Sequence, residues 1–302
     1  MSHDHAHPGA DAKPLARALA LIVAFMAVEV ALGVVAGSLV LLSDAAHMLV
    51  DALALGIGVW AARLAARPPS GGMTFGFRRA EILSAQVNGA TLLLLGLAIV
   101  AEAVRRLITP PEVHGGLVVA TAAAGAVVDV VALGQVARAN RESLNVEGSY
   151  QHLLTDLYAF AATFVAGLVV WTTGFERADP IASLVVAGSM LLAAWPLLHR
   201  SGRILLEAAP EGVDPAAIGA ALRANACVVD VHDLHVWEIS SGFPALSAHV
   251  LVRPGDDCHG VRRELEATLR ERFAIIHTTL QVDHAHPELL TIRSLRSDRQ
   301  DR

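Results

Sequence analysis

Long apolar runs dominate the first two thirds of the chain, and short polar stretches with glycine or proline separate them. A helix that crosses the hydrocarbon core of a bilayer needs about 20 mostly apolar residues. The segments that meet this length are residues 15–36, 40–64, 80–107, 114–137, 150–174 and 180–205. The pattern therefore predicts six membrane-spanning helices joined by short turns.

After Pro210 the long apolar runs give way to mixed charge and shorter repeats. Asp214 followed by Pro215 is typical of a helix N-terminus, and predicts a helix that continues to about Ala224. The remaining elements predicted by periodicity are strands over 228–239, 245–252 and 275–282 and an amphipathic helix over 257–273. This αββαβ order predicts a small soluble α+β domain. The expected organisation is a flexible tail (1–14), a transmembrane domain (15–208), a C-terminal domain (209–290) and a disordered tail (291–302).

The distribution of charge adds the expected orientation of the helices in the membrane. Charged residues make up 17% of the chain, against about 25% in soluble domains. The net charge of −6 indicates no surface for nucleic acid. With a cytoplasmic N-terminus, the cytoplasmic flanks carry ten basic residues: Lys13, Arg17, Arg63, Arg67, Arg78, Arg79, Arg138, Arg141, Arg200 and Arg203. The other loops carry three: Arg105, Arg106 and Arg177. Both termini are therefore expected in the cytoplasm, in an inner-membrane protein surrounded by lipid.

Two of the apolar segments contain the same ionisable pattern, His-xxx-Asp. His47 and Asp51 lie in the second segment, and His152 and Asp156 lie in the fifth. Ionisable residues inside a membrane span are costly and indicate function. A spacing of four places each pair on one helix face, so two facing helices supply four ligands, the number that Zn²⁺ prefers. The alternative is that these are unrelated polar residues in helix contacts.

Other polar residues in the apolar segments are candidates for a supporting role. Asp44 lies one turn before His47 and is expected to support the ligands or to admit the cation. The others are Asn88 and Asp129, which could line the same cavity, and Glu29 and Glu102, which could instead pair with arginines or lie near the membrane surface.

Four stretches of the chain resemble the cation diffusion facilitator family, above all its bacterial zinc, cadmium and cobalt exporters and the related animal zinc transporters. They are GSLVLLSDAAHMLVDALAL, TFGFRRAEILSAQVNGATLL, LNVEGSYQHLLTDLYAF and VHDLHVWEISSGFPALSAHV. The resemblance covers about residues 15–285. It implies six transmembrane helices, a cytoplasmic metallochaperone-like domain, a homodimer, and exchange of cytosolic metal for protons. It also implies a preference for zinc, which accompanies a histidine at the position of His47.

The resemblance further implies a cytoplasmic zinc site made by His232, His249, His277 and Asp283. A plainer interpretation is that some of these histidines only pack in strands. His235 has the opposite strand parity to His232 and is expected to pack or to form hydrogen bonds. Residues that could add ligands are Cys258, His259, His284 and His286. The N-terminal His3, His5 and His7 either collect metal weakly or have no required role.

Two departures from family patterns are visible. The connection 138–145 contains no histidine, unlike the His-rich loop of some family members. The loop 67–76, where other members carry a metal site, contains no histidine, acidic residue or cysteine, so no metal site is expected there. Cys227 and Cys258 form no CxxC pair, which argues against a disulfide framework or a cysteine-rich zinc site.

The sequence thus favours a Zn²⁺/H⁺ antiporter that works by alternating access. Zinc ligands must be deprotonated, so metal ions and protons compete for the same atoms. An alternative is a metal-sensing membrane protein without transport, which the cytoplasmic histidines would allow. An intramembrane metalloprotease is a further alternative, but its His-Glu-xx-His motif is missing, so no enzyme is expected.

Overall fold

The computed structural model describes residues 12–36, 39–109 and 115–285. The side chains of 29, 32–33, 35–36, 39–47, 50, 115 and 117 also lie outside the description, as do both tails. The chain divides between Gly202 and Arg203 into two compact units. Because both tails lie outside the described residues, what the sequence predicts for them stays a prediction.

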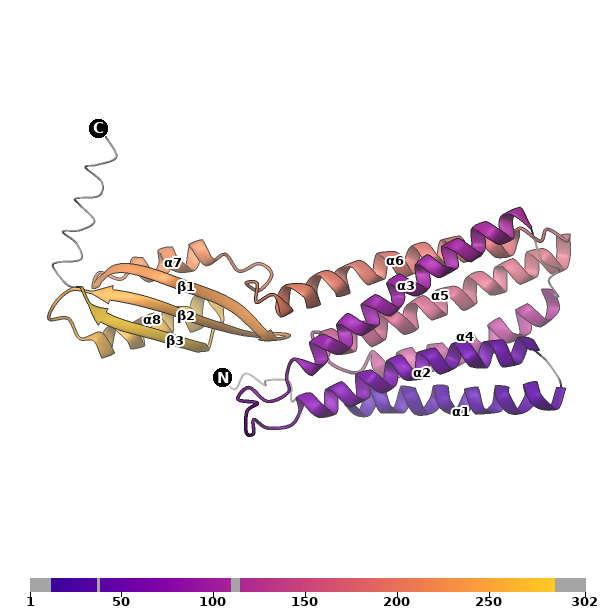
Figure 1. Cartoon of the computed structure of the whole chain (residues 1–302), viewed down its shortest axis with the longest axis horizontal. Coiled ribbons are helices and arrows are strands. Elements are labelled where there is room, and N and C mark those ends of the chain that lie inside the picture. The colour runs from indigo at the N-terminus through magenta and orange to yellow at the C-terminus, as the bar shows by residue number, and fades with distance from the viewer. Residues whose placement is uncertain (1–11, 37–38, 110–114, 286–302) are drawn as a thin grey trace, which may run out of the picture. The chain divides into compact units, whose positions relative to one another are not determined.

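The first unit is a bundle of six helices (Figure 1). They are α1 (Ala12–Ala36), α2 (Leu39–Ala65), α3 (Ala80–Ile108), α4 (Gly115–Val136), α5 (Leu144–Thr173) and α6 (Ala178–Leu205). The bounds lie within three residues of the predicted ones except at α5, which begins at 144 instead of 150. Its polar first two turns are buried in helix contacts, including Asn145 and Ser149. The pattern of apolar residues does not include such a polar stretch in a membrane-spanning helix.

Four helical segments in the described residues are long and apolar enough to cross a membrane. They are Ala80–Ile108, Val118–Val136, Leu144–Thr173 and Ala178–Leu205. Their exposed surface is rich in large apolar side chains, such as Leu94 in α3, Trp171 in α5 and Leu192 in α6. Apolar residues pointing away from the protein are expected where the surroundings are hydrocarbon. The first unit is therefore a membrane domain.

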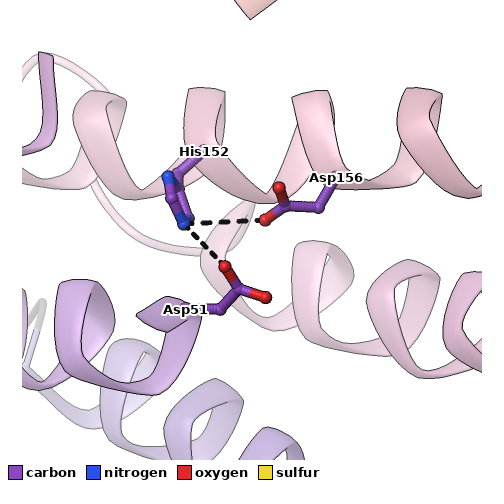
Figure 2. A group of neighbouring side chains, drawn as sticks. All are labelled: Asp51, His152 and Asp156. Atoms are coloured by element: carbon purple, nitrogen blue, oxygen red, sulfur yellow. Dashed lines mark hydrogen bonds and ion pairs between the residues drawn. The ribbon is translucent and has the colours of Figure 1, made fainter. Parts of the chain in front are cut away.

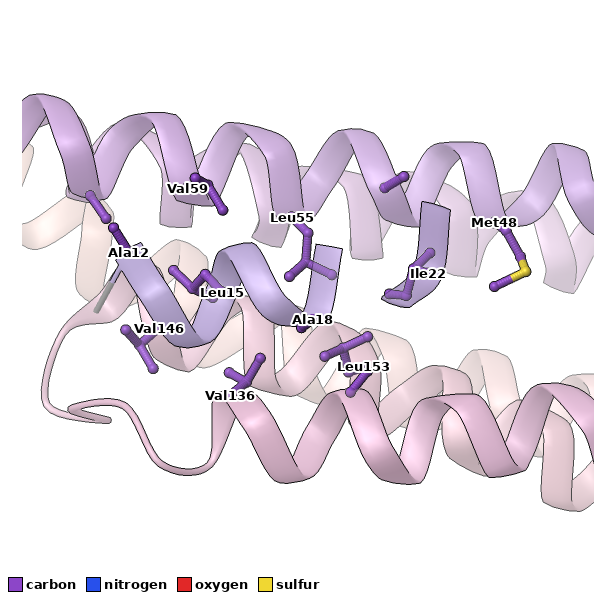
Figure 3. Packing of buried hydrophobic residues seen from close by; sticks show 13 residues of the cluster. Ala12, Leu15, Ala18, Ile22, Met48, Leu55, Val59, Val136, Val146 and Leu153 are labelled. Atoms are coloured by element: carbon purple, nitrogen blue, oxygen red, sulfur yellow. The ribbon is translucent and has the colours of Figure 1, made fainter. Parts of the chain in front are cut away.

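Two apolar clusters hold the bundle together, and α5 contributes to both. The first cluster joins α1, α2, α4 and α5 (Figure 3), with Leu15, Leu55, Val136 and Leu153 among its buried side chains. The second joins α3 to α6, with Leu92 against Met190 and Leu197, and Ala159 and Ala162 of α5 pack on it. Helix α5 therefore lies between the two groups, with one face toward each.

The second unit confirms the predicted αββαβ order. Its elements are α7 (Pro215–Arg223), β1 (Val228–Ser240), β2 (Phe243–Val252), α8 (Cys258–Phe273) and β3 (His277–His284). The carboxylates of Asp214 and Asp257 cap the two helices by accepting hydrogen bonds from the backbone amides of Ala216 and His259. Asp257 is thus the cap of α8 and not its first residue.

The three strands form one sheet in the order β1-β2-β3. Strand β2 is antiparallel to β1 and parallel to β3. The sheet packs Leu246, Ala248 and Val250 against apolar side chains of α7 and α8, such as Leu222 and Leu265. Because side chains alternate along a strand, the residues between them, including His249, lie on the opposite face of the sheet.

Candidate metal centre

Asp51 of α2 and His152 and Asp156 of α5 converge on one point (Figure 2). The Nε2 atom of His152 lies 3.1 Å from Oδ1 of Asp51 and 3.7 Å from Oδ2 of Asp156. One ligand atom of each residue lies within 4.8 Å of the other two. An imidazole and two carboxylates at this separation form a ligand set suited to a divalent transition metal.

Burial at this centre is uneven. The side chain of His152 is 2% exposed, whereas those of Asp51 and Asp156 are 21% and 19% exposed. Oδ2 of Asp156, which faces Nε2 of His152, is buried without a hydrogen bond from the described residues. Buried polar atoms are normally satisfied, so those lacking a bond are where a ligand is expected. The carboxylate pair would also neutralise a divalent cation and offset the cost of its burial.

The pairing of α2 with α5 places these residues opposite one another. Asn145 lies seven residues before His152, and Gly58 lies seven residues after Asp51. The side-chain amide of Asn145 donates a 2.9 Å hydrogen bond to the carbonyl of Gly58. A Cβ atom at Gly58 would lie 3.0 Å from Oγ of Ser149, so glycine permits this close approach. The buried polar contact fixes the two helices two turns away from the centre.

The other predicted residues of the membrane site have different outcomes. The side chains of His47 and Asp44 lie outside the described residues, so their parts in the centre stay predictions. Asn88 is fully buried in α3, with its amide close to Gly148 of α5, and it does not line the cavity beside the centre. Asp129 is buried in α4 at 4% exposure. Glu102 pairs with arginines, one of the two options given above.

A cavity of about 540 Å³ adjoins the centre and extends along α3. Asp51, Thr155 and Asp156 line it near the centre. Glu102 and Arg106 line it near the end of α3, and Ser183 lines it near the start of α6. Arg106 and Ser183 were not assigned to the site from sequence, because only the packing of α3 and α6 places them on the cavity wall.

In the second unit, strand register brings together two of the four predicted cytoplasmic ligands. His232 of β1 pairs directly with His249 of β2, and their ring centroids are 5.4 Å apart. Gln281 of β3 lies opposite His249, and Asp283 lies two residues further along, opposite Leu251. The carboxylate of Asp283 accepts a 2.8 Å hydrogen bond from the Gln281 amide.

His277 lies apart from this pair. It is paired with Ala245, and its ring contacts that of Phe243 at 5.7 Å between centroids. His277 and Asp283 are six positions apart, which corresponds to about 20 Å at the rise of a strand. The two residues lie on the same face of β3, but within one chain their distance along the strand keeps them from sharing one metal ion. No group of three or more metal-ligating side chains is assembled in the described part of this unit.

Asp233 is a residue at the histidine pair that the sequence did not single out. It lies at a β-bulge between His232 and His235, with a left-handed φ of 54°. Its carboxylate contacts Nε2 of His235 at 2.9 Å and Nε2 of His249 at 3.9 Å. The hydrogen bond from His235, with the charges of His235 and His249, lowers the pKa of Asp233. His235 therefore forms a hydrogen bond, one of its two expected roles. The bulge places it opposite Ser247 and so on the same face as His232, not on the opposite face that strand parity predicted.

The further candidate ligands of this unit make one close contact. The Cys258 sulfur lies 3.3 Å from Nε2 of His284, whose same nitrogen lies 3.0 Å from the carbonyl of Asp256. His286, like the N-terminal histidines, lies outside the described residues. The contact provides two ligands, too few by themselves for a tetrahedral zinc site.

Two family models match the chain, one for each unit. The cation efflux transmembrane domain matches residues 15–206, and the cytoplasmic domain of cation efflux proteins matches residues 210–285. The second match identifies the second unit, which follows α6 in the chain, as the cytoplasmic domain of the family.

Characterised relatives match along nearly the whole chain. The metal cation efflux system protein CzcD of Cupriavidus metallidurans is 34% identical, covering 94% of this chain and 90% of the relative. The zinc transporter ZitB of Shigella flexneri is 35% identical, covering 94% and 93%. A cadmium, cobalt and zinc/H⁺-K⁺ antiporter of Bacillus subtilis is 33% identical, covering 94% and 92%.

Proposed function

Because this chain belongs to the cation efflux family, we propose that it exports Zn²⁺ from the cytoplasm in exchange for protons. The convergence of Asp51, His152 and Asp156 beside a cavity in the membrane domain is the observation that carries this proposal. His47, one turn before Asp51, would be the fourth ligand and complete a tetrahedral set. Asp44 and Asp129 would support these ligands from nearby.

Proton coupling is supported by the contact at the centre. Nε2 of His152 is the atom nearest both carboxylates, and it binds either a proton or a metal ion. A protonated imidazole between Asp51 and Asp156 would compensate one of their two charges once the metal has left, and a second proton on His47 would compensate the other. Histidine is the side chain that most often serves as a proton carrier near neutral pH, so it suits a proton-coupled site. A relative that is named an H⁺-coupled antiporter supports the same exchange.

The side of the membrane on which the cavity would open is inferred from the packing of α3 on α6. Gln86 of α3 contacts Ser201 of α6, whereas Arg106 of α3 contacts Asp179 of α6, so these helices are antiparallel. Since α6 ends on the cytoplasmic side, the cavity extends from the centre toward the opposite side. We place six spans in the inner membrane with both termini in the cytoplasm, consistent with the excess of basic residues on the cytoplasmic flanks.

The cytoplasmic domain would sense metal and pair two subunits in a homodimer. His232 and His249 would begin its zinc site, with Asp283 the nearest of the remaining predicted ligands along the sheet. His277 would contribute only through a different arrangement from that within one chain. Metal bound outside the membrane path would regulate transport by favouring one of two conformations.

Flux into sealed vesicles tests the proposed function. Purified protein in vesicles with an imposed pH gradient should move Zn²⁺ against its own gradient, and a protonophore should abolish this movement. Repeating the assay with Cd²⁺ and Co²⁺ gives the cargo preference. A protein that binds Zn²⁺ but moves no metal under any gradient would be a sensor, and the proposal would be wrong.

A further inference from the structure

A chain of ion pairs lies at the end of the cavity away from the cytoplasm. Glu102 accepts hydrogen bonds from Nε and Nη2 of Arg105 at 2.9 and 2.8 Å, and from Nε of Arg106 at 2.7 Å. Nη1 of Arg106 lies 3.7 Å from Oδ2 of Asp179, in the first turn of α6. We call these four residues the outer mouth. Arg106 is the residue that joins α3 to α6 there.

The two arginines differ in what they face. Arg106 and Glu102 line the cavity that reaches the metal centre, and their side chains are 42% and 40% exposed. Arg105 does not line the cavity and is 73% exposed. The arginines have the same charge and share a carboxylate, but only Arg106 lies on the cavity wall.

The charges of the outer mouth balance, whereas those of the metal centre do not. Two carboxylates face two guanidinium groups at the mouth, which is formally neutral. Asp51 and Asp156 make the other end of the same cavity strongly attractive to a cation. Without Arg106, the mouth would expose surplus carboxylate along the exit path and hold a leaving divalent cation.

We propose that Arg106 promotes release of the exported cation by neutralising Glu102 and Asp179 at the outer mouth of the cavity. Arg106 acts on the affinity of the exit path for the cation and is not a ligand of the centre. The inference rests on the proposed export function for its biological meaning. The electrostatic part of the inference is that Arg106 lowers the affinity of the cavity for Zn²⁺. This affinity can be measured without transport.

The experiment compares Arg106→Gln with Arg105→Gln as a matched control. Zn²⁺ is titrated calorimetrically into purified full-length protein, and the binding that Asp156→Ala removes is assigned to the cavity. Arg106→Gln should tighten this binding about fivefold or more. Arg105→Gln should change it by less than about twofold, because its charge is largely screened by solvent. Arg106→Lys, which keeps the charge, should resemble the unmutated protein.

Glu102→Gln keeps the test decisive if Arg106→Gln does not fold. It leaves the mouth with excess positive charge, so cavity binding should weaken about fivefold. Equal effects of the two arginine substitutions, or unchanged binding in both Arg106→Gln and Glu102→Gln, would overturn the inference. In vesicles, zinc on the outer side should inhibit export by Arg106→Gln at a lower concentration than it inhibits the unmutated protein. Absent flux in the unmutated protein counts against the proposed function, whereas the binding comparison decides the role of Arg106.

Discussion

The imidazole of His152 lies 3.1 Å from the carboxylate of Asp51, although the two residues are 101 positions apart in the sequence. The contact joins two helices of the membrane domain at a place where one face of α5 meets α2 and another faces the cavity. A metal ion bound there is held by side chains of two separate helices. Relative movement of α2 and α5 would therefore change its coordination.

Removing either carboxylate of the centre should abolish export. Asp51→Asn and Asp156→Asn keep the size of the side chain but leave one carboxylate to compensate a divalent ion. Breaking one partner of a buried charged pair costs about 3–5 kcal/mol, so flux should fall at least about 100-fold. Zn²⁺ flux in vesicles is the measurement, with exposed Glu142→Gln as the control. Flux in either variant near that of the control would show that cargo does not pass through this centre.

Replacing His47 with aspartate should broaden the cargo range. Imidazole suits Zn²⁺, while an added carboxylate favours harder or larger cations. His47→Asp should continue to transport and should raise the Cd²⁺/Zn²⁺ flux ratio about tenfold, the equivalent of about 1.4 kcal/mol. The ratio is measured with both metals at equal concentration. An unchanged ratio would place selectivity elsewhere in the chain.

The paired histidines of the sheet should regulate export without carrying metal. His232→Ala combined with His249→Ala should raise the Zn²⁺ concentration needed for half-maximal flux several-fold and reduce thermal stabilisation by Zn²⁺. A tenfold weaker site corresponds to about 1.4 kcal/mol. His277→Ala is the matched control, because it removes a histidine from the same sheet but far from the pair.

Three results of that comparison contradict this division of roles. Loss of all flux at saturating Zn²⁺ in the folded double variant would place the pair in the transport path. Equal effects of His277→Ala and the double variant would require a site assembled differently from the one within a single chain. Unchanged stabilisation by Zn²⁺ in the double variant would leave the pair without a metal.

Gly125 should tolerate no side chain. A Cβ atom there would overlap the ring of Phe160, which lines the cavity, whereas a Cβ atom at Gly134 in the same helix meets nothing within 4 Å. Gly125→Ala should cost about 1–3 kcal/mol through overpacking and reduce flux by displacing Phe160. Gly134→Ala should be neutral or stabilising by about 0.4–1 kcal/mol. Thermal unfolding in detergent compares the two, and equal melting temperatures would contradict the packing seen between α4 and α5.

Local patterns were sufficient for the elements of both units. Apolar runs identified the helices of the first unit, because a bilayer requires a nearly uniform apolar surface along each span. Alternation, helical periodicity and the capping residue Asp214 identified the elements of the second unit, because side-chain periodicity and helix termini are local properties. The start of α5 was misplaced for the same reason, since its buried polar turns lack an apolar pattern.

The sequence by itself determined which residues could bind metal. Costly ionisable groups in apolar segments stand out, and the spacing of His152 and Asp156 fixes them on one helix face without any knowledge of the fold. Only the tertiary structure decided which of these residues meet. The approach of α2 to α5 at Gly58 brings Asp51 to His152, and the antiparallel packing of α3 on α6 brings Arg106 to Asp179. Strand register likewise sets His249 beside His232 and leaves His277 near Phe243. Periodicity specifies the face on which a side chain lies, whereas contact between elements depends on their relative position and register, which arise from packing over the whole domain.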